Sequence, residues 1–142
     1  STSEARAVSS GGQVVVGVDN FFPPLAGPQV FYGRRAFRYT DEGGMQDLGV
    51  LPEYQTSEAV DVSANGRVVV GNSERYPSDA AIPFPTDLVQ PFRWTEGDGM
   101  VGLGNLPRFF PAVFLPPQQE TVANAVSADG RVVVGLDRVQ PI

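Results

Sequence analysis

The clearest pattern along the chain is a pair of short β-prone runs on either side of a glycine-containing turn, and it occurs three times. The copies lie at residues 5–17, 59–71 and 125–135. Gly-Gly, Asn-Gly or Asp-Gly stands at the turn, and these dipeptides tolerate the positive φ that tight hairpins require. A Val-Val-Val run closed by glycine follows each turn, which is typical of a strand buried on both faces. We therefore expect three equivalent hairpins with buried valine strands.

A second kind of hairpin follows the first two copies. An aromatic strand at 36–40 is joined by an acidic Gly-rich turn to a returning strand at 45–49. The same text recurs at 92–95 and 99–104, and Leu-Pro closes each unit. We expect the proline-rich segments between the two kinds of hairpin to be irregular, together with an insertion before the third copy; these segments are 18–35, 72–90 and 108–117.

Four strands in a period of about 55 residues are typical of a repeat β architecture, most simply one propeller blade per repeat. No segment shows helical periodicity, and 16 Gly with 13 Pro would interrupt most helices. The sequence predicts an all-β fold made of tandem four-stranded antiparallel units, propeller-blade-like, with about two and a half repeats. The chain is then a single β-repeat domain, 1–142, with repeat 1 at about 3–56, repeat 2 at about 57–120 and a partial repeat 3 at about 121–142.

Several matching segments resemble the bacterial HAF-type extracellular repeat; they are 35–39, 44–49, 62–66 and 69–71, with Ser57 and Ala59. The family is named for a His-Ala-Phe tripeptide. Arg35 stands where the family has histidine, and in the second copy only Phe92 of the tripeptide is kept. The resemblance covers nearly the whole chain outside the proline-rich segments. It implies a secreted or surface-exposed bacterial β-repeat protein without catalytic residues.

The composition excludes several classes of function. A net charge of −6 argues against a nucleic-acid partner, since phosphate-binding surfaces are basic. No apolar run is long enough to span a bilayer. The chain has neither cysteine nor histidine, so it can form no disulfide, thiolate nucleophile, histidine base or zinc site of the usual kind. We expect no cofactor and no metal ion, and only a hard ion bound by oxygen atoms could be an exception.

Two sets of residues invite a chemical interpretation. Asp129, Asn65 and Gly12 occupy the same turn position, where calcium could bind, but turns favour these residue types for conformational reasons. Paired carboxylates in the second kind of hairpin suggest a glycosidase; they are Asp41, Glu42, Glu96 and Asp98. Their recurrence at matching repeat positions favours a structural role, because an active site normally occurs once. We therefore expect no catalytic residues and no enzyme.

Aromatic residues in the proline-rich segments are the candidate contacts with a partner or with other copies; they are Phe21, Phe22, Phe84, Phe109, Phe110 and Phe114. Loops are usually polar, so apolar loops either cover the sheet or bind a partner. We weigh these two explanations equally.

These patterns predict a non-enzymatic secreted or cell-surface protein with a structural or adhesive role. Its partners are other copies of itself, in an oligomer or filament, or extracellular components. The alternative is a glycan-binding or glycan-hydrolysing propeller module. One hairpin lacks a counterpart, so open sheet edges are expected. Either these edges pair with neighbouring subunits, or the chain, which starts at Ser1 without Met, is a processed protein or a piece of a longer one.

Overall fold

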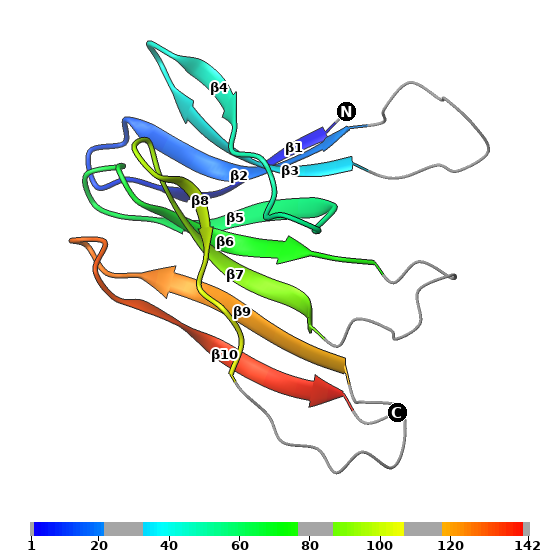
Figure 1. Cartoon of the computed structure of the whole chain (residues 1–142). Coiled ribbons are helices and arrows are strands. Elements are labelled where there is room, and N and C mark those ends of the chain that lie inside the picture. Colours follow the sequence, from blue (N-terminus) through cyan, green and yellow to red (C-terminus); the bar gives the residue numbers. More distant parts are fainter. Residues whose placement is uncertain (1, 22–32, 77–86, 107–117, 141–142) are drawn as a thin grey trace, which may run out of the picture.

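The computed structural model describes residues 2–21, 33–76, 87–106 and 118–140, which form ten strands and no helix. The predicted all-β class is therefore confirmed. The strands form a curved array, with the strands of the first repeat at the top of Figure 1 and β9 and β10 at the bottom. In chain order they are β1 (Thr2–Val8), β2 (Val14–Phe21), β3 (Gly33–Thr40), β4 (Gly44–Asp47), β5 (Thr56–Val62), β6 (Val69–Glu74), β7 (Asp87–Thr95), β8 (Gly99–Gly102), β9 (Gln118–Val126) and β10 (Val133–Gln140).

The strands form two sheets. The first has the order β1-β2-β3-β4, and every neighbouring pair is antiparallel. The second has the order β10-β9-β7-β6-β5, and β8 also pairs with β7. One edge of β7 is shared, because its end at Phe92 to Thr95 pairs with β8 and its start at Asp87 pairs in parallel with β9. The second and third repeats thus belong to one sheet, and the arrangement of the repeats as propeller blades stays a prediction.

Each hairpin of the first kind contains a β-bulge opposite the glycine that closes the valine run. The register shifts between Ala5 and Ala7 in β1, and the same shift recurs in the two later copies. A β-carbon at this glycine would collide with a backbone carbonyl oxygen of the bulged strand; the glycines are Gly17, Gly71 and Gly135, against Glu4, Glu58 and Val122. A bulge that brings two backbones this close explains why glycine ends all three runs.

The main core lies between the first sheet and β5, β6 and β7. Valines of β2 and the buried Phe92 and Trp94 of β7 meet there, together with leucines of the segment after β4; the full set is Val14, Val16, Ala36, Leu48, Leu51, Tyr54, Ala59, Val62, Val69, Phe92 and Trp94. A smaller cluster of Val68, Val70 and Ala123 joins β6 to β9. Each cluster lies between one repeat and the next, so each repeat buries its neighbour's apolar face.

The irregular segments are shorter than the sequence suggested. β2 continues to Phe21 and β3 begins at Gly33, so the expected irregular stretch 18–35 is strand at both of its ends. Val18 is buried and pairs with Ala36, which explains the extension. β6 likewise continues to Glu74 and β7 begins at Asp87. The whole of the expected insertion at 108–117 lies outside the described residues, as do the central parts of the other two segments.

Candidate functional site

The turns of the three first-kind hairpins have the same hydrogen bonds. In the second copy the Ser63 N–H donates to the Val68 carbonyl (2.9 Å), and the Gly66 N–H donates to the Ser63 carbonyl (2.9 Å). The Val68 N–H donates back to the Ser63 hydroxyl (3.0 Å). Ser9 and Ser127 make the corresponding three bonds in the other copies. The predicted equivalence of the three hairpins is thus found in their turns at the level of single hydrogen bonds.

The three turns stack on one another. The Ser10 N–H donates to the Ala64 carbonyl (3.0 Å), and the Ala64 N–H donates to the Ala128 carbonyl (3.0 Å). A β-carbon on Gly66 would collide with Val14, and one on Gly130 would collide with Val68. The same relation between successive turns therefore occurs twice, from the first repeat to the second and from the second to the third.

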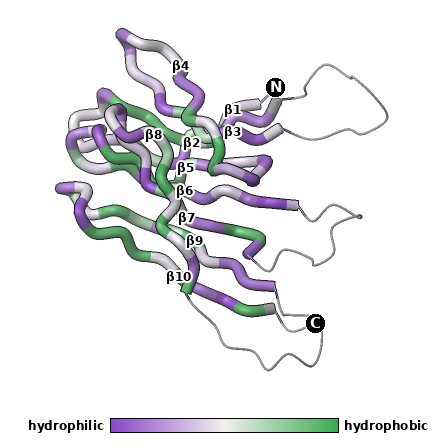
Figure 2. Tube along the Cα trace, in the orientation of Figure 1, coloured by the Kyte–Doolittle hydropathy of each residue, from purple (hydrophilic) through white to green (hydrophobic). Residues whose placement is uncertain are grey.

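The end of this stack at β10 is open. Val14 and Val68 are only 6% and 7% exposed because the next turn covers them, whereas Val132, at the same position in the third turn, is 57% exposed. Val134 and Leu136 of β10 are exposed as well. Figure 2 shows the hydrophobic residues of this hairpin gathered toward its turn. We call Val132, Val134 and Leu136 the β10 face.

The prediction of three buried valine runs is therefore correct in part. Val68, Val69 and Val70 are all buried. Val132 and Val134 are exposed, so for them the prediction is wrong. The reason is that burial on this face depends on the next repeat, and among the described residues no further hairpin follows β10.

The first repeat, at the other end of the stack, is open on the opposite side: it exposes positions whose counterparts in the second repeat are covered. Val8 is 57% exposed, whereas Val62, its counterpart in the second repeat, is 6% exposed. Tyr39 is exposed, although its counterpart Trp94 lies in the main core. At Gly12 no described atom lies within 4 Å of where a β-carbon would be. We call Val8, Gly12 and Tyr39 the β1 face.

The turn residues considered for calcium have a structural role in the described chain. The Asp129 carboxylate accepts hydrogen bonds from the Ser127 hydroxyl (2.6 Å) and the Arg131 N–H (3.1 Å). The Ser127 bond, and after it the Arg131 bond, lowers the pKa of Asp129. Asn65 accepts the same two bonds in its own turn. Hydrogen bonds within each turn thus account for these side chains.

The alignment of the first turn differs by one residue from the sequence interpretation. Gly12 has a φ of 71°, like Gly66 at 72° and Gly130 at 74°. Gly11, and not Gly12, is therefore the counterpart of Asn65. The Gly-Gly dipeptide gave no side chain by which to fix this register.

The carboxylates considered for catalysis are only partly brought together. A groove of about 670 Å³ is lined by Asp41, Glu42 and Glu96, together with Arg38 and Arg67. The Arg38 guanidinium lies 5.9 Å from the centre of the Trp94 ring, as expected for an arginine that stacks on an aromatic side chain. The groove is thus a polar concavity of mixed charge between the two sheets.

Asp98 is not a lining residue of this groove. Its carboxylate accepts a hydrogen bond from the Thr95 hydroxyl (3.0 Å), and its N–H donates to the same hydroxyl (3.1 Å). These bonds close the turn between β7 and β8. The side chain of Asp98 therefore stabilises its own hairpin.

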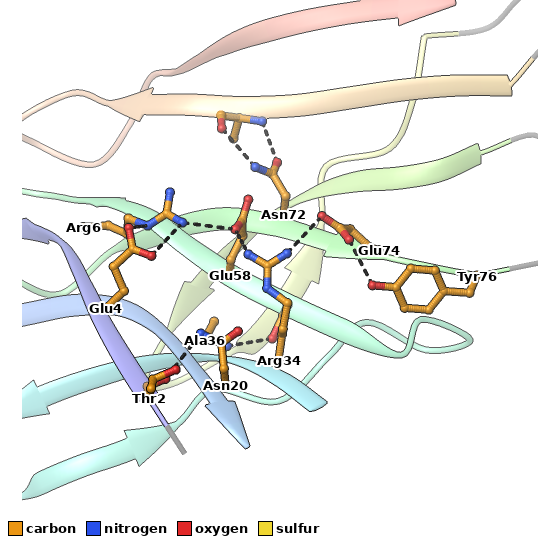
Figure 3. Close-up of polar contacts among 12 residues, drawn as sticks. Thr2, Glu4, Arg6, Asn20, Arg34, Ala36, Glu58, Asn72, Glu74 and Tyr76 are labelled. Carbon is orange, nitrogen blue, oxygen red and sulfur yellow. Dashed lines mark hydrogen bonds and ion pairs between the residues drawn. The ribbon is translucent and has the colours of Figure 1, made fainter. Parts of the chain in front are cut away.

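An ion network that sequence reasoning missed joins the two sheets (Figure 3). Arg34 of β3 lies 2.6 Å from Glu58 of β5 and 3.7 Å from Glu74 of β6. Arg6 of β1 lies 3.9 Å from Glu58 and 2.8 Å from Glu4. Glu58 thus pairs with arginines of two strands, and Arg34 extends the network to β6. The sequence offered no signal for this, because the local pattern of charges does not show which side chains lie opposite one another across two sheets.

A second polar cluster surrounds a buried tyrosine. The Tyr54 hydroxyl donates to the Asp87 carboxylate (3.0 Å), and the Arg75 guanidinium lies 5.0 Å from the centre of the Tyr54 ring. Arg75 also pairs with Asp87. Burial, and after it the Asp87 charge, raises the pKa of Tyr54 to about 12. The phenol therefore stays protonated and acts as a hydrogen-bond donor.

Five of the six phenylalanines predicted as partner contacts lie outside the described residues. Phe21 is the last residue of β2 and pairs with Gly33, so the expectation that it lies outside a strand is wrong. The other five lie outside the described residues; they are Phe22, Phe84, Phe109, Phe110 and Phe114. The candidate functional surfaces of the described chain are therefore its two open faces and the polar groove.

Comparison of the chain with protein-family models, with curated proteins and with solved structures found no match in any of the three. In the part of the chain that the structure describes, no helix has the length and apolarity needed to cross a membrane. The same residues contain no group of three or more acidic side chains placed to hold a metal ion.

Proposed function

We propose that this chain is a non-enzymatic β-repeat protein with a structural or adhesive role, which assembles head to tail with copies of itself. The observation that carries the proposal is the pair of open faces at the two ends of the turn stack. Inside the chain the counterparts of these two faces cover each other twice, at Val14 over Gly66 and at Val68 over Gly130. A second copy can repeat the same contact, with its Gly12 under Val132.

The backbone supports the same arrangement. Within the chain each turn donates one N–H to the carbonyl of the next turn. In the assembly the Ala128 N–H would donate to the Ser10 carbonyl of a second copy, and Val132 and Val134 would pack against its Val8. Burying a half-exposed valine contributes on the order of 1 kcal/mol, so several such side chains are needed to offset the entropy of association. We therefore expect a contact of moderate affinity.

The contact joins two different surfaces, so it leaves a free face at each end of a dimer. Such a heterologous contact builds a ring if its rotation closes and a filament if it does not. This property suits a protein whose role is structural.

The same proposal includes the arrangement of the repeats, the location of the protein and its lack of catalytic activity. We infer a blade-like arrangement of the repeats because β5 contacts β2 and β3, and β9 contacts the equivalent strands β6 and β7. The HAF-type resemblance supports an extracellular or cell-surface location. The absence of His and Cys from the chain supports a role without nucleophilic or histidine-based catalysis.

The test is a mixing experiment with one blocked face in each variant. Val132→Glu blocks the β10 face and Val8→Glu blocks the β1 face, and both residues are exposed in the single chain. Each variant alone should sediment as a monomer, and the two mixed should form a 1:1 dimer through their intact faces. Val101→Glu is the control, because Val101 and its counterpart Gln46 are both exposed. A parent chain that stays monomeric at high concentration contradicts the proposal.

The polar groove supports a second candidate, a polar ligand such as a glycan. Its volume of about 670 Å³ and its lining by Asp41, Glu42 and Glu96 suit a hydroxyl-rich molecule. Calorimetric titration with a panel of oligosaccharides tests this, with Glu96→Gln as the variant expected to weaken binding. No heat from any oligosaccharide, or the same affinity in Glu96→Gln, argues against this candidate.

A further inference from the structure

A second open feature lies beside β9 and β10, on the side of this hairpin that faces the second repeat. A cavity of about 320 Å³ opens there, and its lining includes Pro91, Leu103, Leu106, Ala123, Val133 and Gly135. The Leu103 and Leu106 side chains are exposed. Asn105 also lines the cavity, and its buried side-chain oxygen has no hydrogen-bond partner among the described residues. We call this cavity the β10 socket.

The chain contains a filled version of the same socket one repeat earlier. The counterparts of the six lining residues are Ala36, Leu48, Leu51, Ala59, Val69 and Gly71. The first five are buried in the main core together with Phe92, which is fully buried. A β-carbon on Gly71 would collide with the Phe92 ring, so the ring lies directly on this glycine. The β10 socket is thus the position of a phenylalanine ring that no described residue of the third repeat supplies.

The pairing of the neighbouring strands fixes how a new strand would lie. β3 pairs with β2, and β7 with β6, with phenylalanine opposite the closing glycine in both cases, at Gly17–Phe37 and Gly71–Phe92. Two residues further along, an aromatic residue lies opposite the middle valine, as in Val69–Trp94. β10 pairs with β9 alone among the described strands, so its other edge is open for such a partner.

We propose that the open edge of β10 binds an extended protein segment of the Phe-Arg-aromatic-Thr type as an additional antiparallel strand. The phenylalanine enters the β10 socket opposite Gly135, and the aromatic residue lies opposite Val133. Main-chain hydrogen bonds to β10 supply affinity and the socket supplies specificity, as in other cases of strand addition. The buried Asn105 oxygen offers an acceptor for a donor of the incoming segment.

This inference is independent of the head-to-tail contact. Leu136 belongs to the β10 face and also lines the β10 socket, but Val132 and Val134 do not line the socket, and Pro91, Leu103 and Leu106 of the second repeat do. Either site could be occupied without the other.

The probe is a synthetic peptide with residues 87–102 of this chain, which carry Phe92 and Trp94 and include both strands of a second-kind hairpin. The host is the Val132→Glu chain, in which the face proposed for assembly is blocked. Fluorescence anisotropy of the labelled peptide should show saturable binding with a Kd of roughly 1–100 µM. Hydrogen exchange of the β10 amides should slow when the peptide binds.

Two matched changes identify the socket. A peptide with Phe92→Ala should bind at least about tenfold more weakly, because it leaves the cavity empty. In the host, Leu106→Glu should weaken binding of the unchanged peptide by a similar factor. If the Leu106→Glu host does not fold, Leu103→Glu is used in its place. Val101→Glu is the control and should leave binding unchanged.

Absence of saturable binding at about 1 mM peptide overturns the proposal. Equal affinity of the Phe92→Ala peptide, or of the Leu106→Glu host, also overturns it. A failure of self-assembly by the parent chain does not affect these readouts, so the two proposals are tested separately.

Discussion

Val14 lies directly over Gly66, so closely that a β-carbon on this glycine would collide with one methyl group and the β-carbon of the valine. Gly66 also has a φ of 72°, in the left-handed region that disfavours other residues. Two independent requirements thus fix glycine at this position. Gly12 shares the conformational requirement, with a φ of 71°, but not the steric one, because the space beside it is open.

This difference gives the first prediction. Gly66→Ala should lower the free energy of unfolding by the left-handed cost of about 1–2 kcal/mol plus an overpacking cost of about 1–3 kcal/mol. Gly12→Ala should show only the first cost. Urea denaturation at protein concentrations below assembly measures both, and equal destabilisation by the two changes would contradict the stacked turns.

The second prediction concerns the serine that closes each turn. The Ser63 hydroxyl is fully buried, accepts the Val68 N–H and donates to Asn65. Ser63→Ala leaves that buried N–H without a partner and should cost about 1–3 kcal/mol of unfolding free energy.

Ser127→Ala is the matched control for this prediction. The same bonds are lost, but they belong to an exposed turn where water can replace the hydroxyl. Its cost should stay below about 1 kcal/mol. If Ser127→Ala is as damaging as Ser63→Ala, the third turn is covered in solution, which the head-to-tail assembly would explain; sedimentation of the same sample decides this.

The contrast between these turns shows what the sequence could predict. The repeated text identified three equivalent hairpins, because the Ser-x-x-Gly-x-Val turn is stabilised by local bonds that each copy carries in full. It could not predict that Val132 would be exposed while Val68 is buried. Burial of that position is not a local property, because it depends on contact with the following repeat.

The order of the strands in the sheets could not be predicted from the sequence for a related reason. β7 pairs with both β8 and β9, and its parallel contact with β9 begins at Asp87–Gln119, between residues far apart in the sequence. Periodicity within a strand carries no information on which distant strand lies beside it. The Arg34–Glu58 pair was missed likewise, since the charges along one strand do not show the partner across the sheets.

The third prediction tests that ion pair. Arg34 and Glu58 lie 2.6 Å apart and both are half-buried, so their interaction is less screened than that of an exposed pair. A double-mutant cycle with Arg34→Met and Glu58→Gln should give a coupling energy of about 1 kcal/mol or more that persists in high salt.

The pair between Arg138 and Glu120 of the terminal hairpin is the comparison for this cycle. Its atoms are 3.1 Å apart, but the Arg138 side chain is exposed. The coupling energy there should be about 0.5 kcal/mol or less and should vanish in high salt. A larger coupling at Arg138 than at Arg34 would show that the network does not join the two sheets as the structure describes.

The fourth prediction follows from Tyr54, whose pKa is raised from 10.0 to about 12 by burial and by the Asp87 carboxylate. The folded chain holds this proton more tightly than the unfolded chain does. The stability linked to this proton is therefore fully present below pH 10 and is lost as the pH rises from 10 toward 12. The loss should approach, at most, about 1.4 kcal/mol per pH unit in this window.

Tyr54→Phe separates this effect from general alkaline unfolding. The variant loses the hydrogen bond to Asp87, so at pH 7 it should be less stable by about 1 kcal/mol. Above pH 10 its unfolding free energy should fall less steeply than that of the parent chain, because no proton at this position remains to be lost, and the two curves should converge. Urea midpoints measured at intervals between pH 8 and pH 12 test this, with Tyr76→Phe as the control for removing an exposed phenol. Parallel curves for Tyr54→Phe and the parent chain would mean that the Tyr54 proton is held no more tightly in the folded chain, and that the Tyr54–Asp87 contact does not form in solution.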